Sequence, residues 1–359
     1  MSEAQTSAPA RTAFADAVAG LTGPDRAAGA EAAALHDRLA KPRGALGRLE
    51  DVGIGLAAIS GVCPPPVPEP VVVAVFAGDH GVLAEGVTPW PQEVTAQMVA
   101  AFCAGGAAVN VLARHTGAEV VVVDVGVATD LPPAPGLLLR KVRHGTANLL
   151  RGPAMTADEA AQALDVGATV AAETVAGGAR CLVTGDMGIA NTTASAALIA
   201  AFTGRPAAEV TGRGTGVDDA TWERKVSVVE RAVARRASGP LDMLASVGGL
   251  EIAAIAGFIV GGAAARVPVV VDGVVALAGL LAAAALAPGC LDYCFAGHRS
   301  TEPGATAALD HLGLEPLLDL GMRLGEGTGA LLAVPLVQAA AKVLREMATL
   351  DGAGVTGKG

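Results

Sequence analysis

Val71-Val-Val-Ala-Val-Phe76 runs directly into the turn Ala77-Gly-Asp-His-Gly81. The first segment is apolar throughout and lacks the alternation of a half-exposed strand, so it predicts a strand buried on both faces. Such strands are typical of parallel sheets, in which helices cover both faces and connect one strand to the next. The segment therefore predicts an α/β fold.

The same pattern recurs along the chain as short apolar runs, each followed by a polar or glycine-containing turn. These runs are residues 120–124, 181–184, 267–271 and 291–295. Helix-like segments separate them, as expected for a parallel sheet with crossover helices. Because ligands of such sheets bind outside the carboxyl ends of the strands, the turns after these runs predict where the site lies.

Composition favours a soluble globular protein. The chain has 359 residues, of which 52% are hydrophobic but only 3% aromatic, so much of the apolar content is Ala and Val. The most apolar stretch, residues 273–288, is rich in alanine and shorter than the roughly 18–20 apolar residues that a membrane span needs. We therefore expect a buried helix there, and no membrane partner.

Charge and cysteine usage exclude further classes. The net charge is −10 and the basic clusters, residues 140–143 and 235–236, are short, so nucleic acid is a poor candidate partner. No signal peptide is recognisable, and the five cysteines have no C-x-x-C spacing, which favours free thiols in the cytoplasm. Cys290 and Cys294 lie near His298, but no further cluster completes a ligand set, so we expect neither a metal nor another cofactor.

Two glycine-containing turns lead into helical segments in a form suited to phosphate. In residues 185–193, Asn191 and Thr192 can cap a helix whose free amides face an anion. Residues 211–219 precede a second helix, from which Lys225 can reach back toward a phosphate. Each turn alone is equally compatible with a plain connection, but the two together favour a mononucleotide. The G-x-x-x-x-G-K-[ST] pattern is absent, which argues against ATP hydrolysis.

A single carboxylate, Glu326, stands among glycines in Arg323-Leu-Gly-Glu-Gly-Thr-Gly329. Glycine on both sides lets a flat reactant approach the acid closely. The apolar run 330–337 follows, and an apolar wall favours the neutral acid, which suits a general base near neutral pH. The alternative is a glutamate that accepts hydrogen bonds from backbone amides at a helix N-terminus. The local sequence leaves both open.

Short motifs follow one another along nearly the whole chain, at residues 41–50, 76–82, 86–97, 185–193, 212–219, 271–273, 297–302 and 324–330. In this order they closely resemble the nicotinate-nucleotide:dimethylbenzimidazole phosphoribosyltransferase family of cobalamin biosynthesis. The resemblance implies transfer of phosphoribose from nicotinate mononucleotide to 5,6-dimethylbenzimidazole, giving nicotinate and α-ribazole 5′-phosphate. Two alternatives remain: transfer to another aromatic acceptor, and a non-catalytic sensor of nicotinate mononucleotide.

The resemblance also implies roles for individual residues. The carboxylate of the Gly-Glu-Gly-Thr-Gly motif, here Glu326, is the family's general base, and the implied reaction inverts ribose C1′. The candidate nucleotide-binding residues, from the two turns and the resemblance, are Asp186, Gly188, Asn191, Thr192, Gly214, Gly216, Lys225 and Ser300. The candidates for the benzimidazole pocket are Gln97 and Leu324.

Other positions are less clear from the residues. Asp186 stands where relatives often have Glu, and Ala190 stands where many have Gly, which we expect to be tolerated only if φ of Ala190 is negative. His80 after Asp79 is either catalytic or, as such pairs more often are, part of a capped turn at a strand end. His298 is a second candidate, for phosphate.

The two ends of the chain differ from its middle. Residues 13–40 and 331–349 are Ala/Leu-rich and helix-like, and the Pro-rich segment 63–70 predicts a stiff linker. The resemblance implies a three-layer Rossmann-like large domain over residues 66–330, and a small helical domain built from residues 1–65 and 331–359. We expect the tail from about residue 351 to be disordered. The resemblance further implies a homodimer with the active site near its interface.

Overall fold

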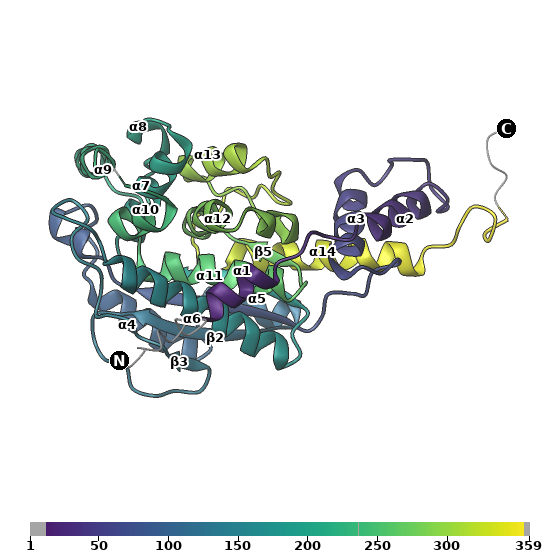
Figure 1. The fold of residues 1–359 in the computed structure, drawn as a ribbon, viewed down its shortest axis with the longest axis horizontal. Coiled ribbons are helices and arrows are strands. Elements are labelled where there is room, and N and C mark those ends of the chain that lie inside the picture. The colour runs from purple at the N-terminus through teal and green to yellow at the C-terminus, as the bar shows by residue number, and fades with distance from the viewer. Residues whose placement is uncertain (1–11, 236, 355–359) are drawn as a thin grey trace, which may run out of the picture.

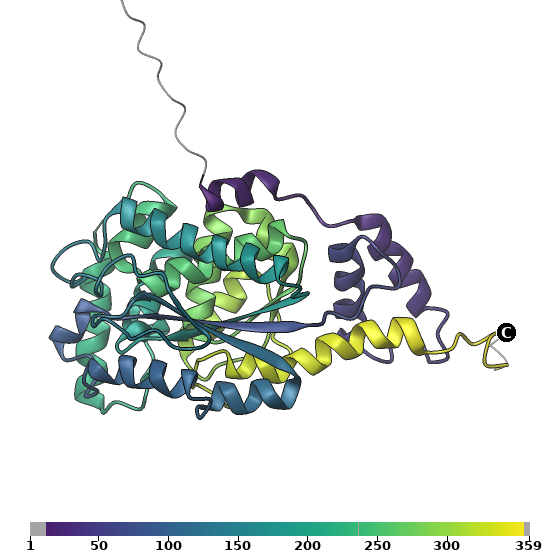
Figure 2. The same cartoon turned by 90° about the horizontal axis from the view of Figure 1, so that it is seen from below.

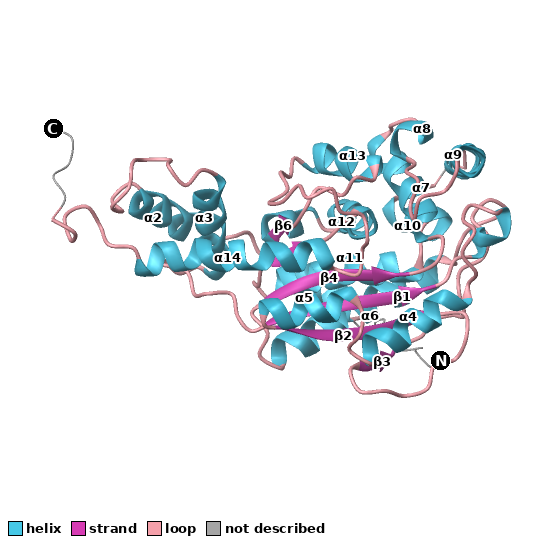
Figure 3. Cartoon of the chain, turned by 180° about the vertical axis from the view of Figure 1, so that it is seen from behind, coloured by secondary structure: helices cyan, strands magenta, loops and turns pink. Residues whose placement is uncertain are grey.

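The computed structural model of the chain describes residues 12–354 except residue 236, and within them a parallel six-stranded sheet organises the fold (Figures 1 and 3). Its strands are β1 Val71–Gly78, β2 Ala118–Gly126, β3 Leu137–Leu139, β4 Cys181–Met187, β5 Val269–Val271 and β6 Cys294–Ala296. Their spatial order is β3-β2-β1-β4-β5-β6, and all the pairings between neighbours are parallel. The order changes direction between β1 and β4, which is where ligands of open α/β sheets bind.

Helices cover both faces of this sheet, so the predicted three-layer α/β architecture is confirmed. One face packs against α6, α7, α11 and α12, and the other against α4, α5 and the first part of α14 (Figure 2). The helices are α1 Ala13–Gly20, α2 Arg26–His36, α3 Arg48–Ser60, α4 Glu93–Cys103, α5 Ala108–Thr116, α6 Ala157–Ala176, α7 Asn191–Thr203, α8 Ala207–Val210, α9 Asp219–Val233, α10 Pro240–Val247, α11 Leu250–Ala264, α12 Val274–Leu286, α13 Pro303–Leu312 and α14 Thr328–Glu346, with 3-10 turns η1 Gly81–Glu85 and η2 Pro288–Tyr293.

All the predicted strands are present, but β5 and β6 begin later in the sequence than predicted. Strand β1 is buried along its whole length, as its apolar sequence predicts. Strand β5 begins only at Val269, and the first part of the predicted run 291–295 is instead the 3-10 turn η2. The short, half-buried strand β3 was not predicted, because three leucines carry no alternation signal.

Glycines let helices α6 and α11, which lie on the same side of the sheet, approach each other closely. A Cβ atom on Gly167 of α6 would lie 1.8 Å from the carbonyl oxygen of Ala254, and one on Gly257 of α11 would lie 2.0 Å from that of Leu164. The backbones of α6 and α11 are therefore in direct contact. The apolar stretch 273–288 is confirmed as a buried helix, since α12 is buried over residues 274–283.

Two helical segments are long and apolar enough to cross a membrane by length and composition alone, namely Glu93–Thr116 and Thr328–Glu346. The second is α14, which packs on the sheet and is 56% buried over its most apolar window. The first combines α4 and α5 around the turn at residues 104–107, and only 28% of its window is buried. The α4–α5 pair thus presents an apolar surface on the outside of the chain.

Helices from the N-terminal and C-terminal parts of the chain pack together beside the sheet (Figures 1 and 2). Helices α2 and α3 pack together and against the second half of α14, around Ala32, Ala57 and Leu344. Helix α1 packs on α6 and α11 instead, so the predicted division into residues 1–65 plus 331–359 and residues 66–330 stays a prediction. Residues 351–354 form a turn, and the rest of the predicted disordered tail lies outside the described residues.

Candidate active site

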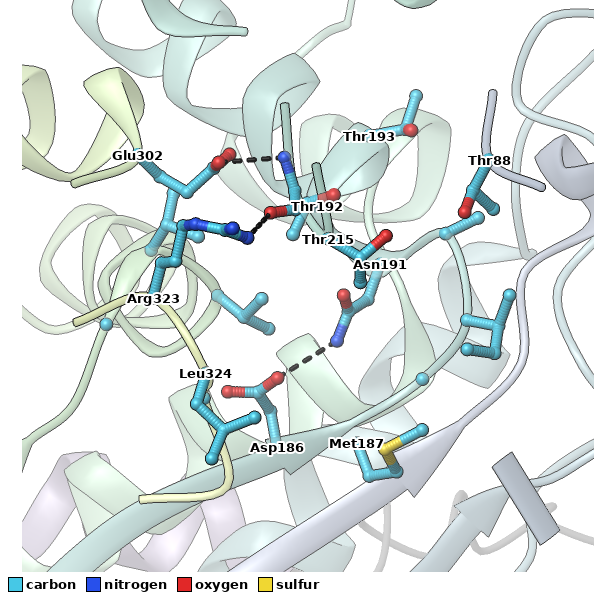
Figure 4. A pocket seen from close by; sticks show the side chains of 18 of the residues that line it. Thr88, Asp186, Met187, Asn191, Thr192, Thr193, Thr215, Glu302, Arg323 and Leu324 are labelled. Carbon is cyan, nitrogen blue, oxygen red and sulfur yellow. Dashed lines mark hydrogen bonds between the residues drawn. The ribbon is translucent and has the colours of Figure 1, made fainter. Parts of the chain in front are cut away.

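A cavity of about 350 Å³ opens at the carboxyl ends of the central strands, where the turns after the apolar runs predict it (Figure 4). The turn after β4, the loop at residues 213–217 and the segment at residues 323–326 all line it. The ends of β5 and β6 contribute Gly273, His298, Ser300 and Glu302. Segments distant in the sequence therefore enclose one site.

Glu326 lies in this cavity with a backbone conformation that is unusual for glutamate. Its φ is 62°, and its neighbours Gly325 and Gly327 have φ of 84° and 87°, so three consecutive residues are left-handed. A residue with a side chain in that region costs about 1–3 kcal/mol and persists only where its surroundings enforce it. Such strain is concentrated at functional sites, which favours a functional role for Glu326 over a plain helix start.

The Glu326 side chain is 5% exposed. Burial raises the pKa of its carboxyl group; the backbone N–H of Val109, at 3.4 Å from Oε2, opposes this, and the charge of Asp272 adds to it. Within the described residues, this one long amide contact is all that supports the capping alternative. A buried carboxyl group with a raised pKa can accept a proton near neutral pH.

Asp186, at the end of β4, is the second carboxyl group of the cavity. Its Oδ2 accepts a hydrogen bond from Asn191 Nδ2 at 3.0 Å, and its Oδ1 has no partner among the described residues. Burial raises the pKa of Asp186 well above its ordinary value, and the nearby charges of Asp272 and Glu251 raise it further. Its Oδ1 is thus available to a ligand in the cavity (Figure 4).

Lys225 joins the two predicted phosphate turns. From α9 its Nζ donates to Thr192 Oγ1 at 2.8 Å and to the carbonyl oxygen of Gly212 at 3.2 Å. Burial lowers the pKa of Lys225 to about 8, although the charge of Glu302 acts in the opposite direction. Thr192 lies in the first turn of α7, so an ammonium group and the positive end of a helix dipole face the same space.

Ala190 differs from the sequence expectation. It precedes α7 with φ of 72°, so the expectation that an alanine requires a negative φ here is wrong. A left-handed alanine costs roughly 1–2 kcal/mol. The residue is 9% exposed and belongs to the main apolar core, and packing of its methyl group offsets part of this cost.

Most predicted site residues come together in the cavity. Its lining includes Asp186, Gly188, Asn191, Thr192, Gly214, Lys225, His298, Ser300, Leu324 and Glu326. Gly216 and Gln97 are not part of the lining. Gln97 is exposed on α4, because Val94 and Met98 occupy the face of that helix that meets the cavity. The assignment of Gln97 to a benzimidazole pocket therefore has no support within one chain.

Asp79 and His80 lie outside the cavity lining. Asp79 Oδ2 accepts a hydrogen bond from the Ala128 N–H at 2.8 Å, and burial raises the pKa of Asp79. His80 Nε2 lies 2.7 Å from Glu251 Oε1, with both side chains fully buried. Burial alone lowers the pKa of His80, but the charge of Glu251, the hydrogen bond to it and the charge of Asp79 together raise the pKa above its ordinary value. This geometry favours the structural alternative, a fixed turn after β1.

Two site residues, Glu302 and Arg323, were not singled out from the sequence. Glu302 Oε1 accepts from the N–H of Gly214 at 2.8 Å and so holds the second turn (Figure 4). At the mouth, Trp90 Nε1 donates to Thr215 Oγ1 at 3.1 Å, and Arg323 donates to the carbonyl of Gly214. Glu302 and Arg323 stand in motifs quoted above, but their partners are too distant in the sequence to be paired from it.

No group of three or more His, Cys, Asp or Glu side chains has an arrangement that would hold a metal ion, among the residues that the structure describes. Cys290 and Cys294 are buried and free, and His298 faces Asp272 instead, with Nε2 at 3.4 Å from Oδ1. Burial alone lowers the pKa of His298, but Asp272, with smaller contributions from the backbone at Arg299 and the charge of Asp319, raises it above its ordinary value.

Comparisons with known proteins find relatives that match this chain over most of its length. The sequence model of a family described as Phosphoribosyltransferase matches residues 21–355. The nicotinate-nucleotide--dimethylbenzimidazole phosphoribosyltransferase of Salinispora tropica is 57% identical over 351 residues, 93% of this chain and 96% of the relative. That of Chloroflexus aggregans is 57% identical over 326 residues, 90% and 92% of the two chains.

Solved structures show the same fold. The crystal structure of nicotinate-nucleotide-dimethylbenzimidazole phosphoribosyltransferase from Thermus thermophilus superposes with a TM-score of 0.89 at 50% identity, covering 93% of this chain and all of the other. A structure of CobT from the same organism superposes with a TM-score of 0.90 at 52% identity, covering 92% of this chain and all of the other.

Proposed function

This chain belongs to the nicotinate-nucleotide--dimethylbenzimidazole phosphoribosyltransferase family, and from this premise we propose that it transfers phosphoribose from nicotinate mononucleotide to 5,6-dimethylbenzimidazole. The products are nicotinate and α-ribazole 5′-phosphate, for the nucleotide loop of cobalamin. The observation that carries the proposal is the buried carboxyl group of Glu326, in one cavity with Lys225 and the start of α7.

In the proposed reaction, Glu326 removes the N–H proton of the benzimidazole, which leaves a ring nitrogen free to attack ribose C1′. The bond from C1′ to the nicotinate nitrogen breaks, and its electron pair returns to the pyridinium ring, which leaves as neutral pyridine nitrogen. Attack from the opposite face inverts C1′ from β to α. The raised pKa of Glu326 matches the task of a base near neutral pH.

We assign the phosphate to Lys225, Thr192 and the N-terminus of α7, because a helix N-terminus and an ammonium group both attract an anion. Asp186 Oδ1, which has no partner in the described part of the chain, is available to a ribose hydroxyl group. Leu324, Met187 and Trp90 supply apolar surface for a flat aromatic ring.

Binding of the mononucleotide is expected to weaken as pH rises past the pKa of Lys225, about 8. Only the ammonium form attracts the phosphate, so Kd should rise by up to about tenfold per pH unit above that pKa. Isothermal titration calorimetry at several pH values, in buffers of different ionisation enthalpy, should also detect proton uptake on binding. Lys225→Met should remove the pH dependence, whereas Lys342→Met, at an exposed lysine of α14, should retain it.

The acceptor is tested with a panel of aromatic bases: 5,6-dimethylbenzimidazole, benzimidazole, adenine and a phenol. Nicotinate release and product mass are measured for each. An apolar pocket distinguishes a methyl group by only about 1–3 kcal/mol, so we expect the dimethyl compound to exceed benzimidazole by roughly tenfold or more in kcat/KM. Binding of the mononucleotide without nicotinate release for any acceptor would instead support a sensor.

We further propose that the protein is a cytoplasmic homodimer that associates through the α4–α5 surface. The support is the apolar, mostly unburied pair of helices, whose Val94 and Met98 also reach the cavity. Free thiols at all five cysteines are compatible with a reducing cytoplasm. Association through this surface would place the partner chain beside the cavity.

One chain has a mass of 35.2 kDa, and light scattering of the dimer should give twice that mass. Val111→Glu, at a valine of α5 that is 52% exposed, should weaken the dimer by more than about tenfold, because the interface would bury an unpaired charge. Val62→Glu, at a valine that is 53% exposed and lies outside α4 and α5, is the matched control and should leave the mass unchanged. A monomeric wild-type protein would contradict the proposal.

A further inference from the structure

Asp272 directly follows β5 and lies behind the turn that carries Glu326, without lining the cavity. Its side chain is completely buried. Oδ2 accepts a hydrogen bond from the N–H of Gly327 at 3.1 Å, and Oδ1 accepts from the N–H of Ala330 at 2.9 Å. These amides belong to the start of α14, where backbone donors have no partner within the helix. One carboxylate thus fastens the C-terminal side of the turn, directly after Glu326, and the start of α14.

Neighbouring strands hold Asp272 in place. Its own N–H donates to Thr184 Oγ1 of β4 at 3.0 Å. From the other side, after β6, His298 Nε2 lies 3.4 Å from Asp272 Oδ1. The His298 ring also lies against the turn, since a Cβ atom on Gly329 would be 2.0 Å from its Cδ2. The carboxylate is therefore fixed from β4, β5 and β6 together.

The turn needs such support because Glu326 is left-handed between two left-handed glycines. The turn also touches β4 directly: a Cβ atom on Gly185 would lie 2.7 Å from the backbone oxygen of Glu326. The backbone of Glu326 is thus held between close packing on β4 and the two hydrogen bonds to Asp272. Loss of these hydrogen bonds removes one of the two restraints on a strained residue.

We propose that Asp272 is a positioning residue for the general base, which holds the left-handed turn so that the Glu326 carboxylate faces the reacting atoms. This inference rests on the proposed function, since the role proposed for Asp272 in the reaction is to position Glu326. Asp272 does not line the cavity and so has no direct contact with the substrates. Its loss should therefore change the catalytic step and leave mononucleotide binding nearly intact.

The test is a double-mutant cycle with Asp272→Asn and Glu326→Gln, measured as kcat and KM for nicotinate release. An asparagine cannot accept hydrogen bonds from both amides, and misplacement of a catalytic group by about 1 Å costs roughly 100-fold. We expect Asp272→Asn to lower kcat by about that factor with KM for the mononucleotide nearly unchanged. In the Glu326→Gln background the same change should have almost no further effect, because no base remains to be positioned.

Two further variants keep the result interpretable. Thr184→Val removes the acceptor for the Asp272 N–H with little change of shape, and should give a smaller loss of kcat that also disappears in the Glu326→Gln background. Asp124→Asn is the matched control. Asp124 is as buried as Asp272 and accepts a hydrogen bond from the N–H of Val127 at 2.9 Å, near the end of β2. It lies outside the cavity lining. It should cost stability without any coupling to Glu326.

The outcomes separate the two proposals. A wild-type enzyme that releases no nicotinate refutes the proposed function itself. A wild-type enzyme that is active and impaired by Glu326→Gln, combined with a normal kcat for Asp272→Asn, overturns the role of Asp272 alone. The role is also overturned if the two substitutions are fully additive, since a merely structural residue would lower activity equally in both backgrounds.

Discussion

Glu326→Gln lowers kcat for nicotinate release by about two to four orders of magnitude, the range for a lost general base. Glutamine has nearly the same shape as glutamate but cannot accept the acceptor's proton at neutral pH. The cavity and the left-handed turn should persist, because neither hydrogen bond from the turn to Asp272 involves the Glu326 side chain. Stopped assays of nicotinate release measure kcat. Calorimetric titration of the mononucleotide measures whether the cavity still binds it.

Glu302→Gln is the matched control for this variant. Glu302 is also a buried acid of the cavity, and its Oε1 accepts from the N–H of Gly214, which a glutamine oxygen can still do. It faces Lys225 in the phosphate turns, so we expect its loss of charge to change KM more than kcat. A normal kcat in Glu326→Gln, with reduced stability, would identify Glu326 as a helix cap and remove it from the reaction.

Gly167→Ala lowers the free energy of unfolding by about 3 kcal/mol, the upper part of the range for overpacked cores. The new Cβ atom would lie 1.8 Å from the carbonyl oxygen of Ala254, and backbone atoms cannot rotate out of the way as a side chain can. Helices α6 and α11 would have to separate, which opens the layer that covers one face of the sheet. Chemical denaturation followed by circular dichroism measures the change.

Gly20→Ala serves as the control, because no heavy atom lies within 4 Å of a Cβ built at that position in α1. Alanine also has a better helix propensity than glycine, so this variant should be neutral or slightly stabilising. Equal stabilities for the two variants would show that α6 and α11 are not in backbone contact.

Much of the fold was predictable because its signal is local. A strand buried on both faces is apolar at consecutive positions, and β1 shows this over its whole length. The closeness of α6 and α11 was not predictable in the same way. Glycines such as Gly167 are visible in the sequence, but which backbone they meet depends on how the two helices cross.

The same distinction between local signals and distant contacts applies to the candidate site. Glu326 stands in a recognisable turn and Lys225 in the helix that follows another, and the structure places both in the cavity. Asp272 and Glu302 act on backbone amides 58 and 88 residues away, so no local pattern pairs them. Gln97 illustrates the opposite error, because a motif on α4 does not tell which face of the helix meets the cavity.

The configuration at C1′ of the product decides whether the reaction is an inverting transfer to an aromatic base. Wild-type protein is incubated with nicotinate mononucleotide and 5,6-dimethylbenzimidazole, and the products are examined by NMR. We expect one nicotinate released per nucleotide formed, and an α linkage between C1′ and the benzimidazole nitrogen. A β-linked product, or nicotinate accompanied only by free ribose 5-phosphate, would contradict an inverting transfer to the benzimidazole.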